Sequence, residues 1–151
     1  MLRRPRAFVI PMFQRREFKF TPFFPLNMTL QILVVEGHGD TRRGLTGLLG
    51  HFGHSISAAD TVQSAVAFVK AKRFDAIVTD LGLPDGSGSD VIREAKRRQD
   101  IAGVALTAND DDAEDVAREA GFDYRLTKPV DFDGLRAVLQ QIVSNHRSAL
   151  A

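Results

Sequence analysis

The sequence predicts an α/β fold in which a five-stranded parallel sheet is covered by helices on both faces. Three observations lead to this prediction. Short apolar runs typical of buried strands recur five times after residue 30. A segment with apolar residues at helical spacing follows each run. Strands that alternate with helices form parallel sheets, because each helix carries the chain back to the same end of the sheet.

The first half of this pattern contains two pairs of a strand and a helix. A buried strand is predicted over Ile32–Glu36, where four aliphatic residues stand in a row. The helix after it, Thr41–His51, is indicated by leucines three and four residues apart. A weaker strand signal at Ser55–Ala59 precedes a helix over Thr61–Lys70, whose Val and Ala residues share one face.

The second half contains the other three pairs. The third strand, Asp75–Thr79, is followed after a loop rich in Gly and Pro by a helix over Gly88–Arg98. The fourth strand, Ala102–Thr107, precedes a helix over Asp110–Ala120, whose acidic first turn suits the positive end of a helix dipole. A short strand is predicted near Tyr124–Thr127. The inner face of the last helix is formed by Leu135, Val138, Leu139 and Ile142.

Length and composition describe one folded domain, predicted over residues 29–147. With 151 residues, 44% of them hydrophobic, the chain can build one core but is too polar for a membrane protein. The absence of cysteine excludes disulfide frameworks, thiolate zinc sites and cysteine nucleophiles, and favours a reducing cytoplasm. Residues 29–151 hold 14 Lys and Arg against 18 Asp and Glu, so this part is mildly acidic and has no nucleic-acid footprint.

The first 28 residues differ from the rest of the chain. They hold four of the six prolines, six of the eleven phenylalanines and six of the twenty Lys and Arg, without a period of 2 or 3.6. We expect this extension to lie outside the fold, either as a disordered leader or because translation starts at Met28. Alternatively, a basic tail with interleaved Phe could dock on anionic lipid or in a partner's groove. Its apolar stretch Ala7–Phe13 is too short for a membrane span.

Four polar residues are expected at the carboxyl ends of different strands: Glu36, Asp80, Thr107 and Lys128. Because parallel strands bring these ends to one edge, the four side chains should lie close together, where open α/β sheets place their ligands. A carboxylate there can act as a nucleophile toward phosphorus if a metal and a cation hold the phosphoryl oxygens. Taken singly, each has a common structural explanation, as a helix cap, a strand Thr or a solvated Lys.

Two other sequence patterns at this edge are incomplete. The run Gly37-His-Gly39-Asp-Thr-Arg42 follows a strand like a dinucleotide fingerprint, but Arg42 stands in place of the third glycine. Asp80 is also placed as in phosphatases that form an aspartyl-phosphate, but their second carboxylate would fall on Gly82. The patterns therefore favour neither a dinucleotide site nor an independent enzyme.

The four residues together, in this order and spacing, resemble the receiver domain of two-component response regulators. The resemblance covers about 30–144 and implies a flavodoxin-like (βα)5 fold. Its last stretch, Gly121-Phe-Asp123 and Lys128-Pro-Val-Asp131, is most similar to receivers attached to hybrid sensor kinases. The matching runs are Ile32–Glu36, Ile77–Asp80, Leu83–Gly88, Ala105–Ala108, Ala120–Gly121 and Leu126–Pro129.

The resemblance implies a role for each site residue. Asp80 would be the phosphoacceptor, phosphorylated from the phosphohistidine of a sensor histidine kinase or of a histidine phosphotransfer protein. Thr107 would be the switch hydroxyl that turns to the phosphate, and Lys128 the ammonium that pairs with it. Mg²⁺ would be held by Asp80, the carbonyl of Gly82 and the acid pair that includes Glu36. The bond that follows Lys128 is a cis peptide bond to proline in the family.

The acid pair departs from the family pattern. It normally consists of two consecutive carboxylates, but here Glu36 is followed by Gly37. The absent acid is the one that usually ligates magnesium directly, so binding should be weak. Neighbouring His38 is expected to be a surface loop residue, since nitrogen suits softer metals. Asp40 is expected to be the N-cap of the first helix.

The switch also departs from the pattern. The position three before Lys128, usually aromatic in stand-alone receivers, is Arg125, and Tyr124 should face the other side of the strand. We therefore predict a signalling receiver rather than an enzyme, with a partner-binding output surface over about 110–144. The alternative is a pseudo-receiver, a protein-interaction module with weak or no magnesium-dependent phosphorylation, which Gly37 favours.

Overall fold

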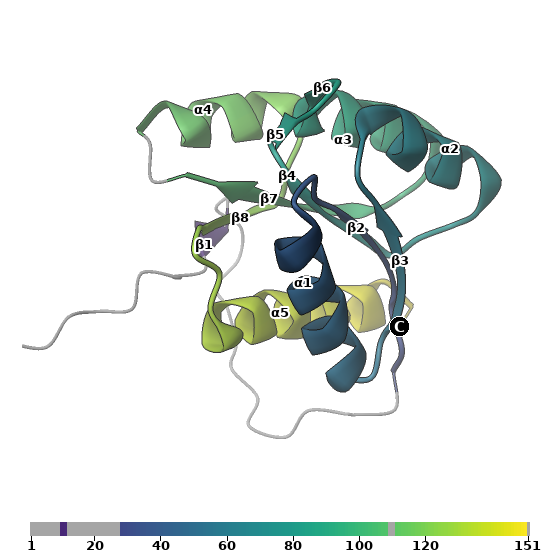
Figure 1. Ribbon diagram of the computed structural model, residues 1–151. Helices are drawn as coiled ribbons and strands as arrows, with labels where there is room; N and C mark the ends of the chain where they lie inside the picture. Colours follow the sequence, from purple (N-terminus) through teal and green to yellow (C-terminus); the bar gives the residue numbers. More distant parts are fainter. Residues whose placement is uncertain (1–9, 12–27, 109–110, 151) are drawn as a thin grey trace, which may run out of the picture.

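The computed structural model describes residues 10–11, 28–108 and 111–150 (Figure 1). Its main sheet has the strand order β1-β8-β7-β4-β2-β3. All neighbours from β8 to β3 pair in parallel, as predicted, and only β1 is antiparallel. The strands are β1 (Ile10–Pro11), β2 (Gln31–Val35), β3 (Ser55–Ala59), β4 (Ala76–Asp80), β7 (Ala102–Thr107) and β8 (Tyr124–Thr127).

Helices cover both faces of this sheet, α1 and α5 on one side and α2, α3 and α4 on the other (Figure 1). Side chains alternate along each strand, so β7 sends Ala105 into one core and Leu106 into the other. Among the described residues, no helix is both long and apolar enough to cross a membrane. The helices are α1 (Gly39–His51), α2 (Val62–Ala71), α3 (Gly88–Arg98), α4 (Asp111–Ala120) and α5 (Phe132–Leu150).

The predicted elements agree closely with the observed ones. The strand Ala102–Thr107 and the helix Gly88–Arg98 have the predicted bounds. One prediction at α1 was wrong. The N-cap is His38, without a side-chain cap, whereas Asp40 lies inside the first turn and pairs with Arg43. A carboxylate in the first turn still complements the helix dipole. An acid is therefore favourable at Asp40, although the N-cap lies two residues earlier.

Two short strands were not predicted. β5 (Gly82–Leu83) and β6 (Gly86–Ser87) form a small antiparallel hairpin between β4 and α3. Asp85 at its tip accepts hydrogen bonds from the backbone N–H groups of Val62 (2.7 Å) and Gln63 (3.1 Å) at the start of α2. Of these, the bond from Val62 contributes most to lowering the pKa of Asp85. These two hydrogen bonds attach the hairpin that follows β4 to the start of α2.

The N-terminal extension touches the sheet at two described residues. Ile10 pairs with Arg125, and Pro11 pairs with Tyr124, along the outer edge of β8. Proline is suited to an edge because it lacks the N–H that a central strand would need. The rest of the extension, residues 1–9 and 12–27, lies outside the described residues, so its predicted independence from the fold stays a prediction.

Polar side chains tie segments together at the amino-terminal edge of the sheet. Gln99 accepts a hydrogen bond from the N–H of Phe74 (2.8 Å) and donates to the carbonyl of Val69 (2.9 Å). Asp123 accepts from the N–H of Gly103 (2.9 Å). Each side chain therefore satisfies a backbone group that the sheet leaves unpaired.

Asp75 and His54 likewise accept hydrogen bonds from backbone N–H groups, at the amino-terminal end of β2. Asp75 accepts from the N–H of Gln31 (2.8 Å), and the Nδ1 atom of His54 accepts from the N–H of Leu30 (3.0 Å). A protonated Nδ1 could not accept that bond. Burial lowers the pKa of His54, and the charge of Asp75 offsets only part of this effect. The fold therefore holds this imidazole neutral.

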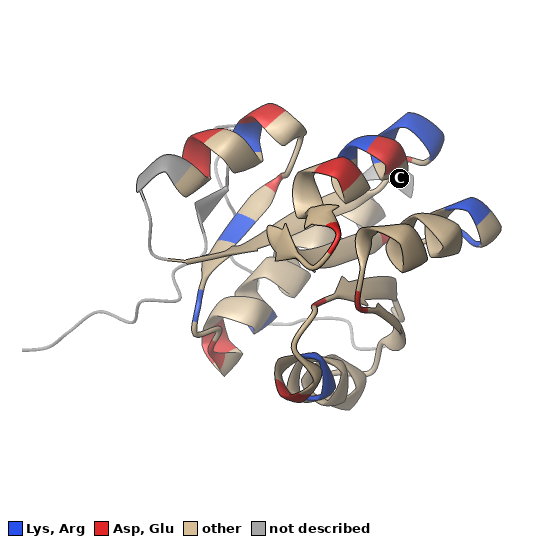
Figure 2. Cartoon of the chain, turned by 45° about the horizontal axis from the view of Figure 1, so that its top comes forward, with Lys and Arg blue, Asp and Glu red and all other residues tan. Residues whose placement is uncertain are grey.

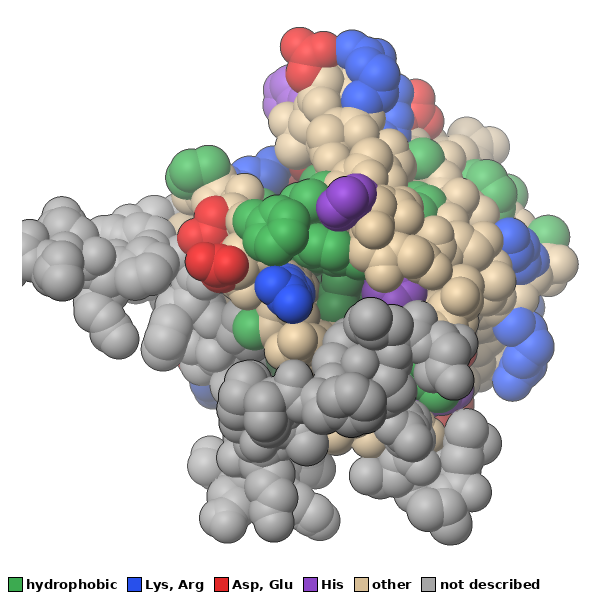
Figure 3. Space-filling model, turned by 90° about the horizontal axis from the view of Figure 1, so that it is seen from below, with side chains coloured by type: hydrophobic (Ala, Val, Ile, Leu, Met, Phe, Trp, Pro, Cys, Tyr) green, Lys and Arg blue, Asp and Glu red, His purple; other side chains and the backbone are tan. Residues whose placement is uncertain are grey.

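Charged and apolar groups gather on different surfaces. Acidic residues follow the exposed side of α4, and basic residues fill the last turn of α3 (Figure 2). Seen from the side of α1 and α5, apolar side chains reach the surface (Figure 3). Phe132 at the start of α5 is 44% exposed, and its ring stands nearly perpendicular to that of Phe52 with centroids 5.0 Å apart.

Candidate phosphoacceptor site

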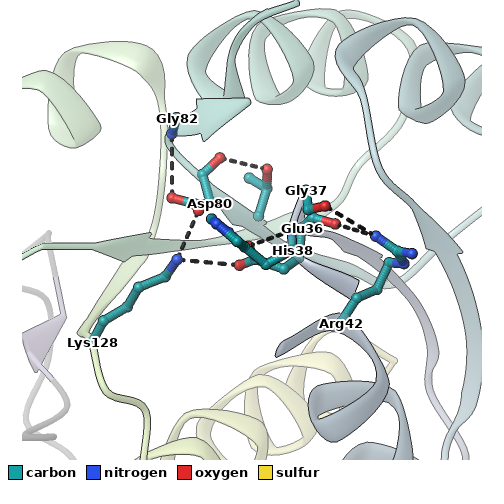
Figure 4. A network of polar contacts seen from close by, with 8 residues as sticks. Glu36, Gly37, His38, Arg42, Asp80, Gly82 and Lys128 are labelled. Carbon is teal, nitrogen blue, oxygen red and sulfur yellow. Dashed lines mark hydrogen bonds and ion pairs between the residues drawn. The ribbon is translucent and has the colours of Figure 1, made fainter. Parts of the chain in front are cut away.

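Asp80 ends β4 at the carboxyl edge of the sheet, as predicted. Its Oδ2 accepts a hydrogen bond from the Nζ of Lys128 (2.7 Å), and its Oδ1 accepts from the N–H of Gly82 (3.2 Å) (Figure 4). The side chain is 16% exposed. Two donors therefore hold this carboxylate in one orientation while solvent still reaches it.

The backbone around Asp80 is fixed by a close contact with α3. The Thr79 hydroxyl donates to the carbonyl of Asp80 (2.9 Å), and the N–H of Gly88 donates to the carbonyl of Leu81 (3.0 Å). A Cβ at Gly88 would stand 2.9 Å from the Thr79 hydroxyl and closer still to the Asp80 carbonyl. Glycine at this position therefore lets α3 begin directly against β4.

Lys128 joins Asp80 to Glu36, which follows β2. Besides Asp80, its Nζ contacts Oε1 of Glu36 (3.2 Å), whose side chain is fully buried. The Lys128 side chain is 31% exposed, and its ammonium contacts both carboxylates. Burial alone would lower the pKa of Lys128, but the hydrogen bond and charge of Asp80, with those of Glu36, outweigh burial and raise it. The peptide bond from Lys128 to Pro129 is cis, as the resemblance implied.

The loop after β2 replaces the expected acid pair by a different arrangement. The second oxygen of Glu36 accepts from the N–H of His38 (3.2 Å), and the His38 ring stands 3.4 Å from it (Figure 4). The His38 side chain is 84% exposed, as expected for a loop residue. Arg42, from the first turn of α1, donates to the carbonyl of Glu36 (2.8 Å). Sequence reasoning gave Arg42 no role, because its partner is a backbone atom.

Gly37 lies beside these groups and against Pro84. A Cβ there would meet the Cδ of Pro84 at 3.2 Å, so a side chain requires a shift of a few tenths of an ångström in an exposed proline ring. Among the described residues, no three His, Asp or Glu groups converge as a metal cluster. The structure thus brings Glu36 and Asp80 together and leaves the third acid of the family pattern absent.

Thr107 lies on the strand next to Asp80, at the end of β7. It is 2% exposed, and its Oγ1 has no hydrogen-bond partner. Its carbonyl accepts from the N–H of Lys128 (2.8 Å). A buried hydroxyl without a partner costs about 1–3 kcal/mol, so this group gains from any state that offers it an acceptor.

Arg125 lies on the face of β8 opposite to Tyr124, as predicted. Tyr124 belongs to the core under α5, whereas the Arg125 guanidinium reaches α4 and stands 3.7 Å from Oε1 of Glu114. Sequence reasoning missed Glu114. The only signal was its place in an acidic helix, where it is one of several carboxylates.

Solved structures share this architecture. The receiver domain of the sensor histidine kinase PA1611 from Pseudomonas aeruginosa, solved with magnesium coordinated in its active site cleft, is 27% identical with a TM-score of 0.70. The match covers 78% of this chain and 99% of that one. A response regulator receiver domain from Methylobacillus flagellatus is also 27% identical, with a TM-score of 0.70 over 76% and 99% of the two chains.

Curated relatives point the same way. The KDP operon transcriptional regulatory protein KdpE of Escherichia coli is 31% identical over 121 residues, which are 80% of this chain and 54% of KdpE. The virulence sensor protein BvgS of Bordetella pertussis is 31% identical over 140 residues, 86% of this chain and 11% of BvgS. The chain thus spans about half of the first relative and about a tenth of the second.

Residues 32–140 match the sequence model of the response regulator receiver domain family. This range contains all of the parallel strands but the first residue of β2, and it contains each group around Asp80 described above. The match, the strand order and the pairing of Asp80 with Lys128 agree on one assignment. This chain belongs to the family of response regulator receiver domains of two-component signalling.

Proposed function

We propose that this chain is a phosphoacceptor of a two-component phosphorelay, in which Asp80 takes a phosphoryl group from the phosphohistidine of a histidine kinase or phosphotransfer protein. The observation that supports this most directly is the Asp80 carboxylate, solvent-accessible at a strand end and held by Lys128 at 2.7 Å. Family membership supplies the donor chemistry. The cysteine-free composition fits a reaction in the cytoplasm.

The residues suggest how the transfer proceeds. An oxygen of Asp80 attacks phosphorus in line with the P–N bond, a new P–O bond forms, and the histidine nitrogen leaves with the electron pair of the P–N bond. Lys128 is already beside the acceptor, so its ammonium can neutralise charge on the phosphoryl oxygens. The unpartnered hydroxyl of Thr107 can then donate to one of these oxygens. The chain would act as a signalling receiver rather than an enzyme, with phosphotransfer and dephosphorylation catalysed at most by this site itself.

The residues present fit a weakly held magnesium ion. Glu36 and Asp80 both contact the Lys128 ammonium, which places two hard oxygen donors around one point, and magnesium often uses one or two carboxylates together with waters. We propose that Glu36, Asp80 and the carbonyl of Gly82 hold it. When bound, the ion would supply positive charge to the phosphoryl oxygens. With Gly37 in place of an acid, and Lys128 compensating the carboxylates, affinity should be low.

A specific observation favours a second candidate function. In the described site, one ammonium contacts both carboxylates, so one of their two negative charges is balanced within the protein and only one remains to attract a metal ion. A pseudo-receiver that binds a partner through its shape and is phosphorylated weakly or not at all would have this property. Gly37 is the residue on which this alternative rests.

The proposed output surface is 110–144, which includes the acidic helix α4, strand β8 and most of α5. The phosphodonor must approach from the carboxyl edge of the sheet, where Asp80 is accessible. Phe132 stands four residues after Lys128 and exposes its ring, so we propose that it contributes an apolar contact to the donor protein.

The deciding experiment exposes the full chain to a small acyl-phosphate donor with and without magnesium, followed by intact mass measurement and peptide mapping. A receiver should gain one phosphoryl group at Asp80, faster with magnesium. A chain that gains none at high donor and magnesium concentrations, while it stays folded by circular dichroism, is a pseudo-receiver. An adduct at another carboxylate would refute the acceptor assignment.

A further inference from the structure

Two polar side chains without full hydrogen bonding face the same helical layer from neighbouring strands. Thr107 and Arg125 lie on the side of β7 and β8 that carries Ala105, whose core is covered by α2, α3 and α4. In the register of this strand pair, Ala105 is opposite Arg125, and Thr107 is opposite Thr127. Arg125 is therefore a diagonal neighbour of Thr107 on one face of the sheet, within reach of a long side chain.

Arg125 is a cation whose side chain is mostly buried and incompletely hydrogen-bonded. Its side chain is 14% exposed, and its Nε is buried without a hydrogen-bond partner. Its terminal nitrogen stands 3.7 Å from Oε1 of Glu114, close enough for attraction and too far for a good hydrogen bond. A buried guanidinium that is paired loosely has more to gain from a nearby anion than a fully bonded one.

We propose that Arg125 and Glu114 form an electrostatic latch that couples the state of Asp80 to helix α4. This inference rests on the proposed phosphoacceptor function and adds the route by which the acceptor controls the output surface. The latch replaces coupling through an aromatic side chain at this position. In the state described by the structure it is closed, and α4 is held over β8.

The physical argument begins at Thr107. When its hydroxyl turns toward a phosphoryl oxygen, it makes the hydrogen bond that it lacks and vacates space on the α4 side of β7. The added phosphoryl group carries nearly two negative charges, which attract the guanidinium from the same side. Arg125 then moves toward β7, and its attraction to Glu114 weakens. Since the Glu114 carboxylate and the phosphoryl group compete for one cation, α4 is released when Asp80 carries the phosphoryl group.

The same helix provides a matched control. Glu114 Oε2 accepts from Arg118 at 3.1 Å, an exposed pair one turn apart within α4. That pair is shorter than the one with Arg125 but joins no second element, and exposed pairs of this type contribute little. If Glu114 acted only as a surface charge, removal of Arg118 and of Arg125 would have similar effects.

The test records backbone amide shifts of the full chain with and without a beryllofluoride phosphoryl mimic. Wild type should shift both in the loop 81–87 and in residues 113–120 of α4. In Arg125→Gln and Glu114→Gln, the loop should still shift, and the α4 response should be lost. In Arg118→Gln, both responses should remain. An α4 response that survives Arg125→Gln, or that Arg118→Gln removes equally, overturns the latch.

A second measurement separates failure of the latch from failure of the proposed function. If loop 81–87 of wild type does not respond to the mimic, phosphoacceptance by Asp80 is refuted. The latch is then judged from urea midpoints without mimic. The double variant of Arg125→Gln and Glu114→Gln should lose less stability than the sum of the two single losses, because both substitutions break the contact between Arg125 and Glu114, and Glu114→Gln in addition breaks only the exposed pair with Arg118. Additive losses in the double variant overturn the latch in the resting protein as well.

Discussion

The two edges of the sheet use polar side chains in opposite ways. At the amino-terminal edge, Gln99, Asp75, His54 and Asp123 each bond to a backbone N–H of another segment. At the carboxyl edge, Asp80, Glu36 and Lys128 bond chiefly to one another, and Thr107 bonds through its side chain to nothing.

The difference shows where the molecule is fixed and where it can respond. Side chains that satisfy backbone donors act as permanent parts of the fold, because their loss leaves a buried group unpaired. Side chains that share one ammonium, or lack a partner, can exchange contacts when a new charge arrives. We therefore expect substitutions at the amino-terminal edge to change stability, and substitutions at the carboxyl edge to change phosphorylation.

The largest expected effect is the complete loss of the phosphoryl adduct in Asp80→Asn, measured by intact mass. The amide removes the nucleophilic charge and keeps the size, so the fold should be retained. Asp85→Asn is the matched control, because it neutralises a carboxylate in the same loop that bonds only backbone N–H groups near α2. It should still be phosphorylated. An undiminished adduct in Asp80→Asn would contradict the assignment.

Gln99→Leu should lower the free energy of unfolding by about 2 kcal/mol, because it leaves the N–H of Phe74 unpaired in a partly buried site. Urea denaturation measures this loss. The phosphorylation level, scored on the remaining folded protein, should be unchanged. Gln63→Leu, at an exposed glutamine of α2, is the control and should change stability little. Equal losses in the two variants would remove the distinction between the edges.

Gly37→Asp should tighten magnesium binding by roughly tenfold, since even groups outside the ligand shell change metal affinity by that much. The new Cβ meets Pro84 at 3.2 Å, and the exposed proline ring can shift. Titration at fixed ionic strength measures the affinity. Gly44→Asp adds the same charge on α1, where a Cβ has open space, and should not change it. The idea fails if both variants bind magnesium alike.

The smallest effect concerns pH. The folded protein holds the pKa of His54 below its ordinary value of 6.5, so the unfolded chain binds the proton more tightly. His54 therefore contributes stability above pH 6.5 that is lost as the pH falls below it, by at most about 1.4 kcal/mol per pH unit. Urea denaturation at pH 7.5 and 5.5 tests this.

Two asparagine variants isolate the contribution of His54. His54→Asn keeps an acceptor for the N–H of Leu30 without a titrating ring, so the loss of stability between the two pH values should become smaller. His51→Asn replaces an exposed ring of α1, and this variant should lose as much stability between the two pH values as wild type does. If both variants behave as wild type does, the pH dependence comes from other groups.

The sequence alone determined the elements of the fold and the groups at the acceptor edge. Buried strands and amphipathic helices are local patterns, so Ala102–Thr107 and Gly88–Arg98 could be predicted to the residue. Asp80 and Lys128 could be placed at one edge because parallel strands end together. The weak magnesium site likewise follows from Gly37, and it stays a prediction.

Which polar groups meet across long separations follows from how the elements pack against one another. The contact of Arg125 with Glu114, the bond of Asp85 to α2 and the ties of Gln99 join segments whose side chains carry no local signal for one another. The local sequence also carries no signal that the Thr107 hydroxyl lacks a hydrogen-bond partner, or that Ile10 pairs with the edge of β8. Periodicity shows which face of an element is buried, but the identity of each polar partner depends on how the elements pack.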